Sequence, residues 1–347
     1  MPIRRGEITI LLCDMELSDT VLNLLSKALH STHFHNFILR GNDFGRAGIK
    51  FVLSYLQNNP ILHDLCLDLN IINHNDDVNQ LCKIIQDHPS ISTLELPGCR
   101  GAEIDGYEML QSIMNLGLNK LLLINLSSNS ISTGGKTFLS VFLARNPILQ
   151  SIILCHNNLD DDDSIMIASA LKHNTNLLSL KLEGNPITRD GWVALRKAEF
   201  NDSSLNSAAD SNHTCSIDYP KGDEVLDVGK MNGDPESDNI YDPKNVRYKK
   251  IYSVLSSRNR NSSHVQHFDD VPVEFLPDIL SSIQQYSKYH VLDHAPYRSR
   301  ARPPHPPHCV HDVKSLSVVY EIMRFWDKAF SAYESLCAAD NYQRNRN

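Results

Sequence analysis

The residues best suited to metal chemistry lie in a short stretch near the end of the chain. His305, His308, Cys309 and His311 follow one another closely, and His294 lies a little earlier. Imidazole and thiolate groups are ligands that Zn²⁺ prefers. However, the stretch lacks the ligand pairs of zinc fingers and knuckles, and the prolines in and around it favour an extended loop. We therefore expect no bound metal and no cofactor.

Four consecutive acidic residues, at positions 160–163, are a second candidate for ion binding. Carboxylate oxygens are the usual ligands of Ca²⁺, but the run lacks the glycine and the ligand spacing of a calcium-binding loop. It directly precedes a segment with helical periodicity. Acidic side chains at this position cap the free N–H groups of a helix and interact with the positive end of its dipole. We predict a helix cap.

A third candidate is a basic segment, residues 244–260, which contains no acidic residue. Such a patch can bind the phosphates of nucleic acid or of an anionic membrane. The alternative is the solvated side of an amphipathic helix, because Tyr248, Ile251 and Leu255 recur at helical spacing. The net charge of −8 gives no general reason to expect nucleic acid or membrane as a partner. The cations are Lys244, Arg247, Lys249, Lys250, Arg258 and Arg260.

Sequence motifs of the common enzyme classes are missing. The chain contains no P-loop, no Rossmann fingerprint, no nucleophile elbow, no HExxH motif and no set of kinase motifs. We therefore predict that the protein is not an enzyme, and we assign no catalytic residue and no small-molecule substrate.

A pattern of apolar residues with an asparagine near its end recurs three times between residues 121 and 187. Each copy follows L-x-x-L-x-L-x-x-N-x-L, and the asparagines are 28 residues apart. Several copies at a constant period identify leucine-rich repeats, which must stack because one repeat cannot bury its apolar side alone. The copies are Leu121, Ile124, Leu126, Asn129, Ile131; Leu149, Ile152, Leu154, Asn157, Leu159; and Leu177, Leu180, Leu182, Asn185, Ile187.

Weaker copies extend the array in both directions. Upstream, the consensus asparagine position holds Asn42, Asn70 and Cys99, and cysteine is the usual substitute there. Residues 8–13 fit a degenerate first strand. Downstream, a frayed final copy with polar substitutions is predicted at Leu205, Ala208, Asp210, His213 and Cys215.

Segments between the predicted strands have the periodicity of amphipathic helices, at residues 49–57, 78–86, 136–144 and 164–172. Parallel strands joined through helices favour a right-handed crossover. The sequence thus predicts an α/β fold, a leucine-rich repeat horseshoe with repeats of 28 to 30 residues, parallel strands on the concave face and helices on the convex face. The consensus asparagines are expected to satisfy backbone groups of adjacent turns.

Composition divides the chain into three parts. Residues 1–219 form the predicted solenoid with degenerate terminal repeats, and residues 220–242 form an acidic, flexible linker. Residues 243–347 form a small helical C-terminal region. Helices are predicted near residues 248–255, 273–286 and 316–336, and a proline-rich loop at residues 298–307.

Cysteine usage and hydropathy bear on location. Eight cysteines are scattered without a close pair, which favours reduced thiols. No run approaches the roughly 18 apolar residues of a membrane span. The short apolar run at residues 8–13 is followed by acidic residues and does not fit a secretory signal. We expect a cytoplasmic protein, with the nucleus as an alternative.

The repeats resemble the ribonuclease-inhibitor class of leucine-rich repeats in period and in their helix-containing unit. The segments LNSAADSNHTC, KIYSVLSSRN, VPVEFLPDIL and SLSVVYEIMRFWDKAF are similar to a set of uncharacterised leucine-rich repeat proteins of diatoms. The resemblance implies a horseshoe that binds other molecules. Horseshoes of this class include activators of small GTPases and innate-type sensors.

Side chains that alternate with the buried strand positions are expected to form the recognition surface. We predict a non-enzymatic scaffold that binds another protein through this surface. The alternatives are a regulator of a small GTPase or an innate-type sensor, and nucleic-acid or membrane association through residues 244–260. The mixed charges of the surface do not predict the charge of the partner. Its residues are Arg40, Asp68, Glu95, Asn125, Ser127, Cys155, Lys181 and Glu183, with Cys66 and Ile153 beside them.

Overall fold

The computed structural model describes residues 7–15, 17–42, 45–115, 120–220, 232 and 242–260. The chain divides into two compact units. The first comprises residues 1–199 and 214–240, and the second comprises residues 200–213 and 241–347. The zinc candidates at residues 294–311, the proline-rich loop and the helices predicted at residues 273–286 and 316–336 lie outside the described residues, as does most of the predicted linker.

The first unit is built on one parallel sheet whose eight strands follow the order of the chain. Each strand pairs with its successor, so that Asn36 lies beside Asp64 and Leu123 beside Ser151. The strands are β1 (Thr9–Cys13), β2 (Asn36–Arg40), β3 (Asp64–Cys66), β4 (Thr93–Glu95), β5 (Leu123–Asn125), β6 (Ser151–Ile153), β7 (Ser179–Lys181) and β8 (Ser216–Asp218).

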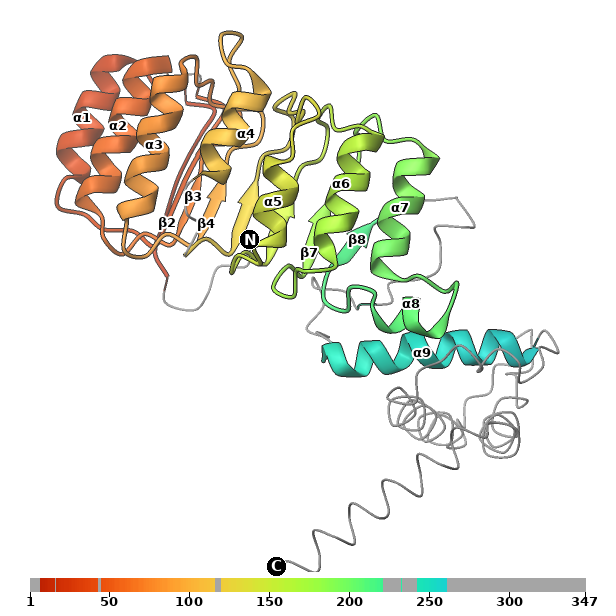
Figure 1. Ribbon diagram of the computed structural model, residues 1–347. Coiled ribbons are helices and arrows are strands. Elements are labelled where there is room, and N and C mark those ends of the chain that lie inside the picture. Colours follow the sequence, from red (N-terminus) through yellow and green to blue (C-terminus); the bar gives the residue numbers. More distant parts are fainter. Residues whose placement is uncertain are drawn as a thin grey trace, which may run out of the picture. The chain divides into compact units, whose positions relative to one another are not determined.

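Seven helices alternate with the strands and lie side by side along one face of this sheet (Figure 1). They are α1 (Asp19–Leu29), α2 (Gly45–Asn58), α3 (Asn75–Asp87), α4 (Gly106–Met114), α5 (Phe138–Ala144), α6 (Asp161–Leu171) and α7 (Arg189–Glu199). Strands that alternate with helices in a single parallel sheet are the architecture of a repeat solenoid. This arrangement confirms the predicted α/β class.

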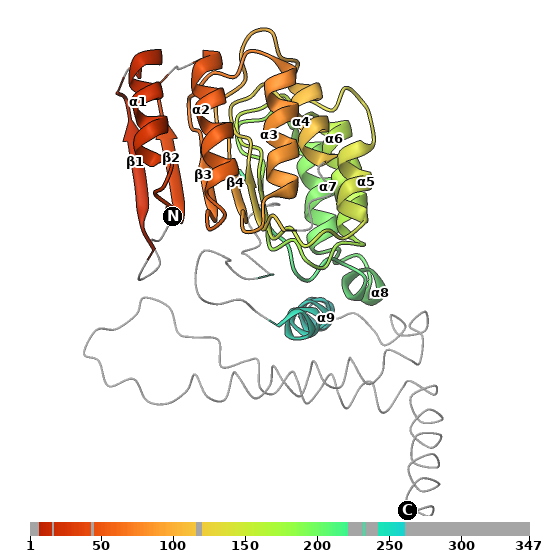
Figure 2. The same ribbon diagram turned by 90° about the vertical axis from the view of Figure 1, so that its left-hand side faces the viewer.

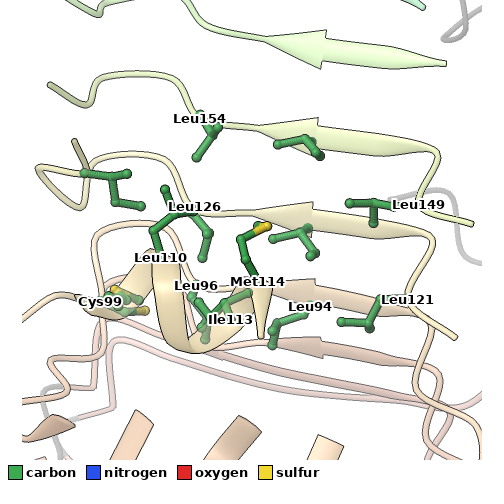
Figure 3. Close-up of a cluster of buried hydrophobic side chains, with 14 of the residues drawn as sticks. Leu94, Leu96, Cys99, Leu110, Ile113, Met114, Leu121, Leu126, Leu149 and Leu154 are labelled. Atoms are coloured by element: carbon green, nitrogen blue, oxygen red, sulfur yellow. The ribbon is translucent and has the colours of Figure 1, made fainter. Parts of the chain in front are cut away.

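The hydrophobic core lies between the sheet and the helices. Along β3, β4, β5 and β6, a buried leucine or isoleucine alternates with partly exposed neighbours. Equivalent leucines of successive repeats therefore stack on one another, as Leu96, Leu126 and Leu154 do in Figure 3. From the helix side, Leu110, Ile113 and Met114 of α4 complete the same cluster, so neighbouring repeats supply each other's core.

Buried asparagines join successive repeats through hydrogen bonds, as the consensus predicts. Asn157 Oδ1 accepts from the backbone N–H groups of Asn129 and Ile131 in the preceding repeat, at 2.9 and 3.0 Å. Asn157 Nδ2 donates to the carbonyl oxygens of Leu126 and Leu154, both at 3.0 Å. At the equivalent position, Cys99 Sγ lies 2.7 Å from the Leu67 carbonyl oxygen. The thiol of Cys99 therefore donates in place of the side-chain N–H group of an asparagine. The expected role of these asparagines is confirmed.

The segment predicted as a frayed final turn, residues 205–215, begins with a helix. Residues Leu205–Ala209 form a helix, α8, and the last strand, β8, begins at Ser216. The cause is local, because Ser204 caps this helix by accepting a hydrogen bond from Ser207 N at 2.9 Å. Ala208 and Asp210 stand at two consensus leucine positions, so the segment has little to bury as a strand.

The second unit, as far as the structure describes it, contains α8 and α9 (Pro243–Arg260). Helix α9 includes the helix predicted at residues 248–255 and the entire basic segment. Val246, Tyr248, Ile251 and Val254 are buried, but so is Lys250, so the cations do not all lie on a solvated side of the helix.

Candidate functional site

The candidate site is the face of the sheet that α1 to α7 leave uncovered, called here the helix-free face. In a strand, successive side chains point to opposite faces, so the neighbours of the buried leucines point to this one. The strand register joins Cys66 to Glu95, Glu95 to Asn125, Asn125 to Ile153 and Ile153 to Lys181 in a continuous row.

A second row lies two residues further along each repeat. Gly41 N donates to Asp68 O, Ser128 N donates to Cys155 O, and His156 N donates to Glu183 O, so the chain continues in register past the strand ends. The predicted residues of this row are thereby placed side by side with the first row. They are Arg40, Asp68, Ser127, Cys155 and Glu183.

Side chains of neighbouring repeats hold one another on this face. Arg40 Nε and Asp68 Oδ2 form an ion pair at 3.2 Å, although the Arg40 side chain remains 57% exposed. Asn125 Nδ2 donates to Glu95 Oε2 at 3.4 Å. Ser127 Oγ in turn donates to Asn125 Oδ1 at 2.8 Å. These contacts orient polar groups over β2 to β5.

Burial is the main cause of the pKa shifts among the ionisable groups of the site. Partial burial raises the pKa of Glu95, the hydrogen bond from Asn125 lowers it, and the nearby carboxylates of Asp64 and Asp68 raise it further. Burial raises the pKa of Cys66 to about 11 and also raises that of Cys155. A reactive cysteine needs a lowered pKa, so both thiols stay protonated near neutral pH. The described side chains of this face can donate and accept hydrogen bonds and carry charges.

A third row on the helix-free face was missed by the sequence-based prediction. It lies two residues before the first row, where the register joins Asp64 to Thr93 and Ser151 to Ser179. In a strand, every second side chain points to the same face, so counting back two residues from the first row would have predicted this row. The row consists of Thr9, Asn36, Asp64, Thr93, Leu123, Ser151, Ser179 and Ser216.

In the second unit, two cations of the basic segment have structural partners. Lys250 is fully buried, and its Nζ donates to Asn212 O at 2.6 Å. Arg247 Nε donates to Ala209 O at 3.2 Å. Both bind carbonyl groups at and beyond the C-terminal end of α8, where positive charge stabilises a helix. Lys244 lies 5.8 Å from the centre of the Tyr248 ring. The side chains of Arg258 and Arg260 lie outside the described residues.

The acidic run at residues 160–163 is a helix cap, as predicted. Asp160 accepts a hydrogen bond from Asp163 N at 3.1 Å, and Asp163 accepts one from Asp160 N, which is a capping box. Asp163 also accepts from Thr133 Oγ1, and Asp161 accepts from Thr188. The part of the chain that the structure describes contains no group of three or more side chains placed to hold a metal ion.

The alternation of parallel strands with helices and the bonded asparagines fit a leucine-rich repeat solenoid. No protein-family model matches the chain. Among known proteins, a mouse protein named NACHT, LRR and PYD domains-containing protein 5 is 28% identical over 254 residues. The match covers 53% of this chain and 22% of the mouse protein, so the chain spans less than a quarter of that relative's length. Within the described residues, no helix is long and apolar enough to cross a membrane.

Proposed function

We propose that this protein is a non-enzymatic scaffold of the ribonuclease-inhibitor type, which binds another protein through the helix-free face of its sheet. The observation that carries the proposal is the continuous set of side-chain rows over eight strands. A solenoid commonly uses such an extended face for recognition. The similarity to a mouse protein that is named for its leucine-rich repeats supports an interaction role.

Two further features of the face support protein binding. Arg40 and Glu183 are exposed, whereas Glu95, Asn125 and Lys181 are partly exposed, so polar groups reach the surface from a rigid sheet. Both thiols are kept protonated by burial, which leaves no activated nucleophile among these residues. Pre-ordered polar groups lower the entropy cost of association.

The test is affinity purification from source lysate with the intact chain and two triple variants. The site variant carries Arg40→Glu, Glu95→Lys and Lys181→Glu. The control variant carries Lys50→Glu, Asp87→Lys and Lys172→Glu, which are exposed residues of α2, α3 and the end of α6. Both variants change the net charge by the same amount. We expect one protein to be recovered by the intact chain and the control but not by the site variant. Equal recovery by all three would contradict the proposal.

The regulatory alternative is distinguished by the recovered partner. A regulator of a small GTPase accelerates nucleotide hydrolysis by that partner, whereas a scaffold binds without changing the turnover. Nucleotide hydrolysis by the recovered protein, measured with and without this chain, separates the two.

A further inference from the structure

A buried histidine, His88, stands at the C-terminal end of α3. Helix α3 lies between α2 and α4 in the row of helices (Figure 2), and His88 follows its last residue. His88 is only 5% exposed. Its backbone N–H donates to the carbonyl oxygens of Ile84 and Ile85 at 2.9 and 3.2 Å. The ring is therefore held inside the array, where water does not replace a lost hydrogen bond.

Both ring nitrogens of His88 bind backbone groups. Nδ1 lies 3.3 Å from Ser90 N and 3.2 Å from Ile91 N. Because both of these groups are N–H donors, Nδ1 must be the unprotonated acceptor. Nε2 then carries the proton and donates to Asn59 O in the preceding repeat, at 2.8 Å. The neutral ring with its proton on Nε2 is the form that satisfies all three contacts.

An asparagine makes the same three contacts elsewhere in the array. His88 and Asn174 each stand three residues before the first apolar residue of the consensus. Asn174 Oδ1 accepts from Asn176 N at 3.1 Å and from Leu177 N at 2.8 Å, the residues two and three positions further on. Asn174 Nδ2 donates to Leu143 O in the preceding repeat at 2.8 Å. His88 thus replaces an asparagine in a second set of hydrogen bonds between repeats.

The histidine differs from the asparagine because its ring can take up a proton near neutral pH. The corresponding residues of three other repeats are Asn59, Asn146 and Asn174, whose amides do not titrate. A proton on Nδ1 of His88 would point at two backbone N–H groups and leave both of them without their acceptor. The protonated ring therefore does not fit the place that the neutral ring occupies.

The surroundings of the ring also oppose a positive charge. Lys120, in the loop before β5, donates from Nζ to His88 O at 3.0 Å, and His63 directly precedes β3. Burial is the main cause that lowers the pKa of His88, and the positive charges of Lys120 and His63 lower it further, whereas the hydrogen bond with Asn59 raises it. The proton thus binds more readily once the ring has left its place.

We propose that His88 is an acid-sensitive joint between the loops that lead into β3 and β4, whereas the asparagine-bonded junction before β7 stays closed in acid. Nδ1 takes up a proton from water, the hydrogen bonds from Ser90 and Ile91 are lost, and the loop before β4 is released. Because each repeat contacts mainly its neighbours, such an opening can remain local. Glu95 of β4 lies beside Cys66 of β3 on the helix-free face, so the opening separates these two residues.

The first test follows amide hydrogen exchange of the full chain from neutral pH to about pH 5, expressed as protection factors, which remove the intrinsic pH dependence of exchange. In the intact protein, protection in β3 and β4 should fall by up to about tenfold per pH unit below about pH 6.5, since one proton is linked to the opening. Protection in β6 and β7 should fall less.

The matched variant is His88→Asn, which should keep the protection of β3 and β4 in acid because the chain uses asparagine for the same contacts at Asn174. The control is His173→Asn, which replaces an exposed histidine beside Asn174 and should behave like the intact protein. Constant protection in the intact protein, an equal loss in His88→Asn, or a uniform loss over all strands would overturn the proposal. A His88→Asn variant that is unfolded at neutral pH would also overturn it, because asparagine would then not be equivalent to His88.

The second test needs no substitution and records the nitrogen chemical shifts of the His88 ring in the intact chain. We expect the proton on Nε2 at neutral pH and titration of Nδ1 below about pH 6.5. A proton on Nδ1 at neutral pH, or titration at or above the pH of an ordinary histidine, would contradict the proposed joint.

Discussion

At the residue scale, the asparagines at the consensus position contribute most clearly to the fold. The side chain of Asn157 satisfies two backbone donors and two buried backbone carbonyls. A buried polar group that loses its partner costs about 1–3 kcal/mol. The sequence pattern is sufficient to predict this role. Each repeat presents the same backbone donors and acceptors at this place, and an asparagine amide can bond to both.

Replacement of Asn157 should therefore destabilise the first unit. We expect Asn157→Ala to reduce the free energy of unfolding by several kcal/mol, since more than one backbone group loses its partner. Thermal and urea unfolding provide the measurement. Asn158→Ala is the control, because Asn158 is exposed and makes a single 3.3 Å bond through Nδ2. Similar melting temperatures for the two variants would contradict this account.

His213 shows what the sequence does not predict at this scale. It occupies the consensus asparagine spacing, yet it lies in the second unit, where Nε2 is 3.0 Å from Ala209 O. Burial and the positive charges of Lys250 and Arg247 lower the pKa of His213 from 6.5 to about 4. These partners lie far away in the sequence, so a local pattern cannot reveal them.

The stability of the second unit should depend on pH through His213. The pKa of the folded state lies below that of the unfolded state, so the unfolded chain binds the proton first. The stabilisation is complete above about pH 6.5 and is lost as the pH falls towards about 4, a loss on the order of 2–3 kcal/mol. Amide hydrogen exchange in α8 and α9 should accelerate over this range. His213→Gln should weaken the pH dependence, whereas His173→Gln should leave it unchanged, since His173 is an exposed residue of the first unit.

At the element scale, the repeating helices and strands and the first strand were predictable, since β1 lies within the predicted residues 8–13, whereas α8 was not. Residues 49–57, 78–86 and 164–172 fall almost entirely within α2, α3 and α6, because their apolar positions recur at helical spacing and neighbours bury them. Residues 205–209 were predicted as part of a frayed final turn of the array, and they form α8. Alanine and aspartate stand there at two of the three consensus leucine positions, Ala208 and Asp210, and the cap at Ser204 favours the helix.

The capping box of α6 permits a sharp comparison between two neighbouring aspartates. Asp160→Ala removes the side chain that accepts from Asp163 N, and we expect a loss of about 1 kcal/mol in stability. Asp162→Ala removes an exposed acid from the same turn, so both variants lose one negative charge near the helix start. Urea unfolding should show a clearly larger loss for Asp160→Ala. Equal losses would mean that charge, and not the cap, stabilises this end.

At the scale of the whole molecule, the first unit is a one-dimensional array in which each repeat contacts its neighbours. The sequence was sufficient to predict this architecture, because repeats with the same apolar pattern bury their apolar sides by stacking on one another. The helix-free face was predicted in part: two of its three rows follow from the consensus, whereas its side-chain contacts, such as Asn125 with Glu95, depend on residues that differ from repeat to repeat.

A core substitution should therefore act over a limited distance. Leu126→Ala creates a cavity within β5's repeat, and we expect a loss of about 2–5 kcal/mol. Because repeats interact mainly with their neighbours, amide exchange should accelerate most in β4, β5 and β6 and least in β1 and β2. Val141→Ala is the control, since Val141 lies exposed on α5. Uniform acceleration across all strands would show that the array unfolds as a single cooperative block.

Along each strand, the side chains on the core face are restricted to apolar residues by packing, whereas those on the helix-free face are not. Leu94, Ile124 and Ile152 are all aliphatic because they meet one another in the core, whereas the equivalent places on the other face hold an acid, an amide and an aliphatic residue, Glu95, Asn125 and Ile153. Substitutions on the helix-free face can therefore accumulate one repeat at a time without repacking the interior. Such a surface can acquire or exchange partners over evolutionary time while its scaffold is inherited unaltered.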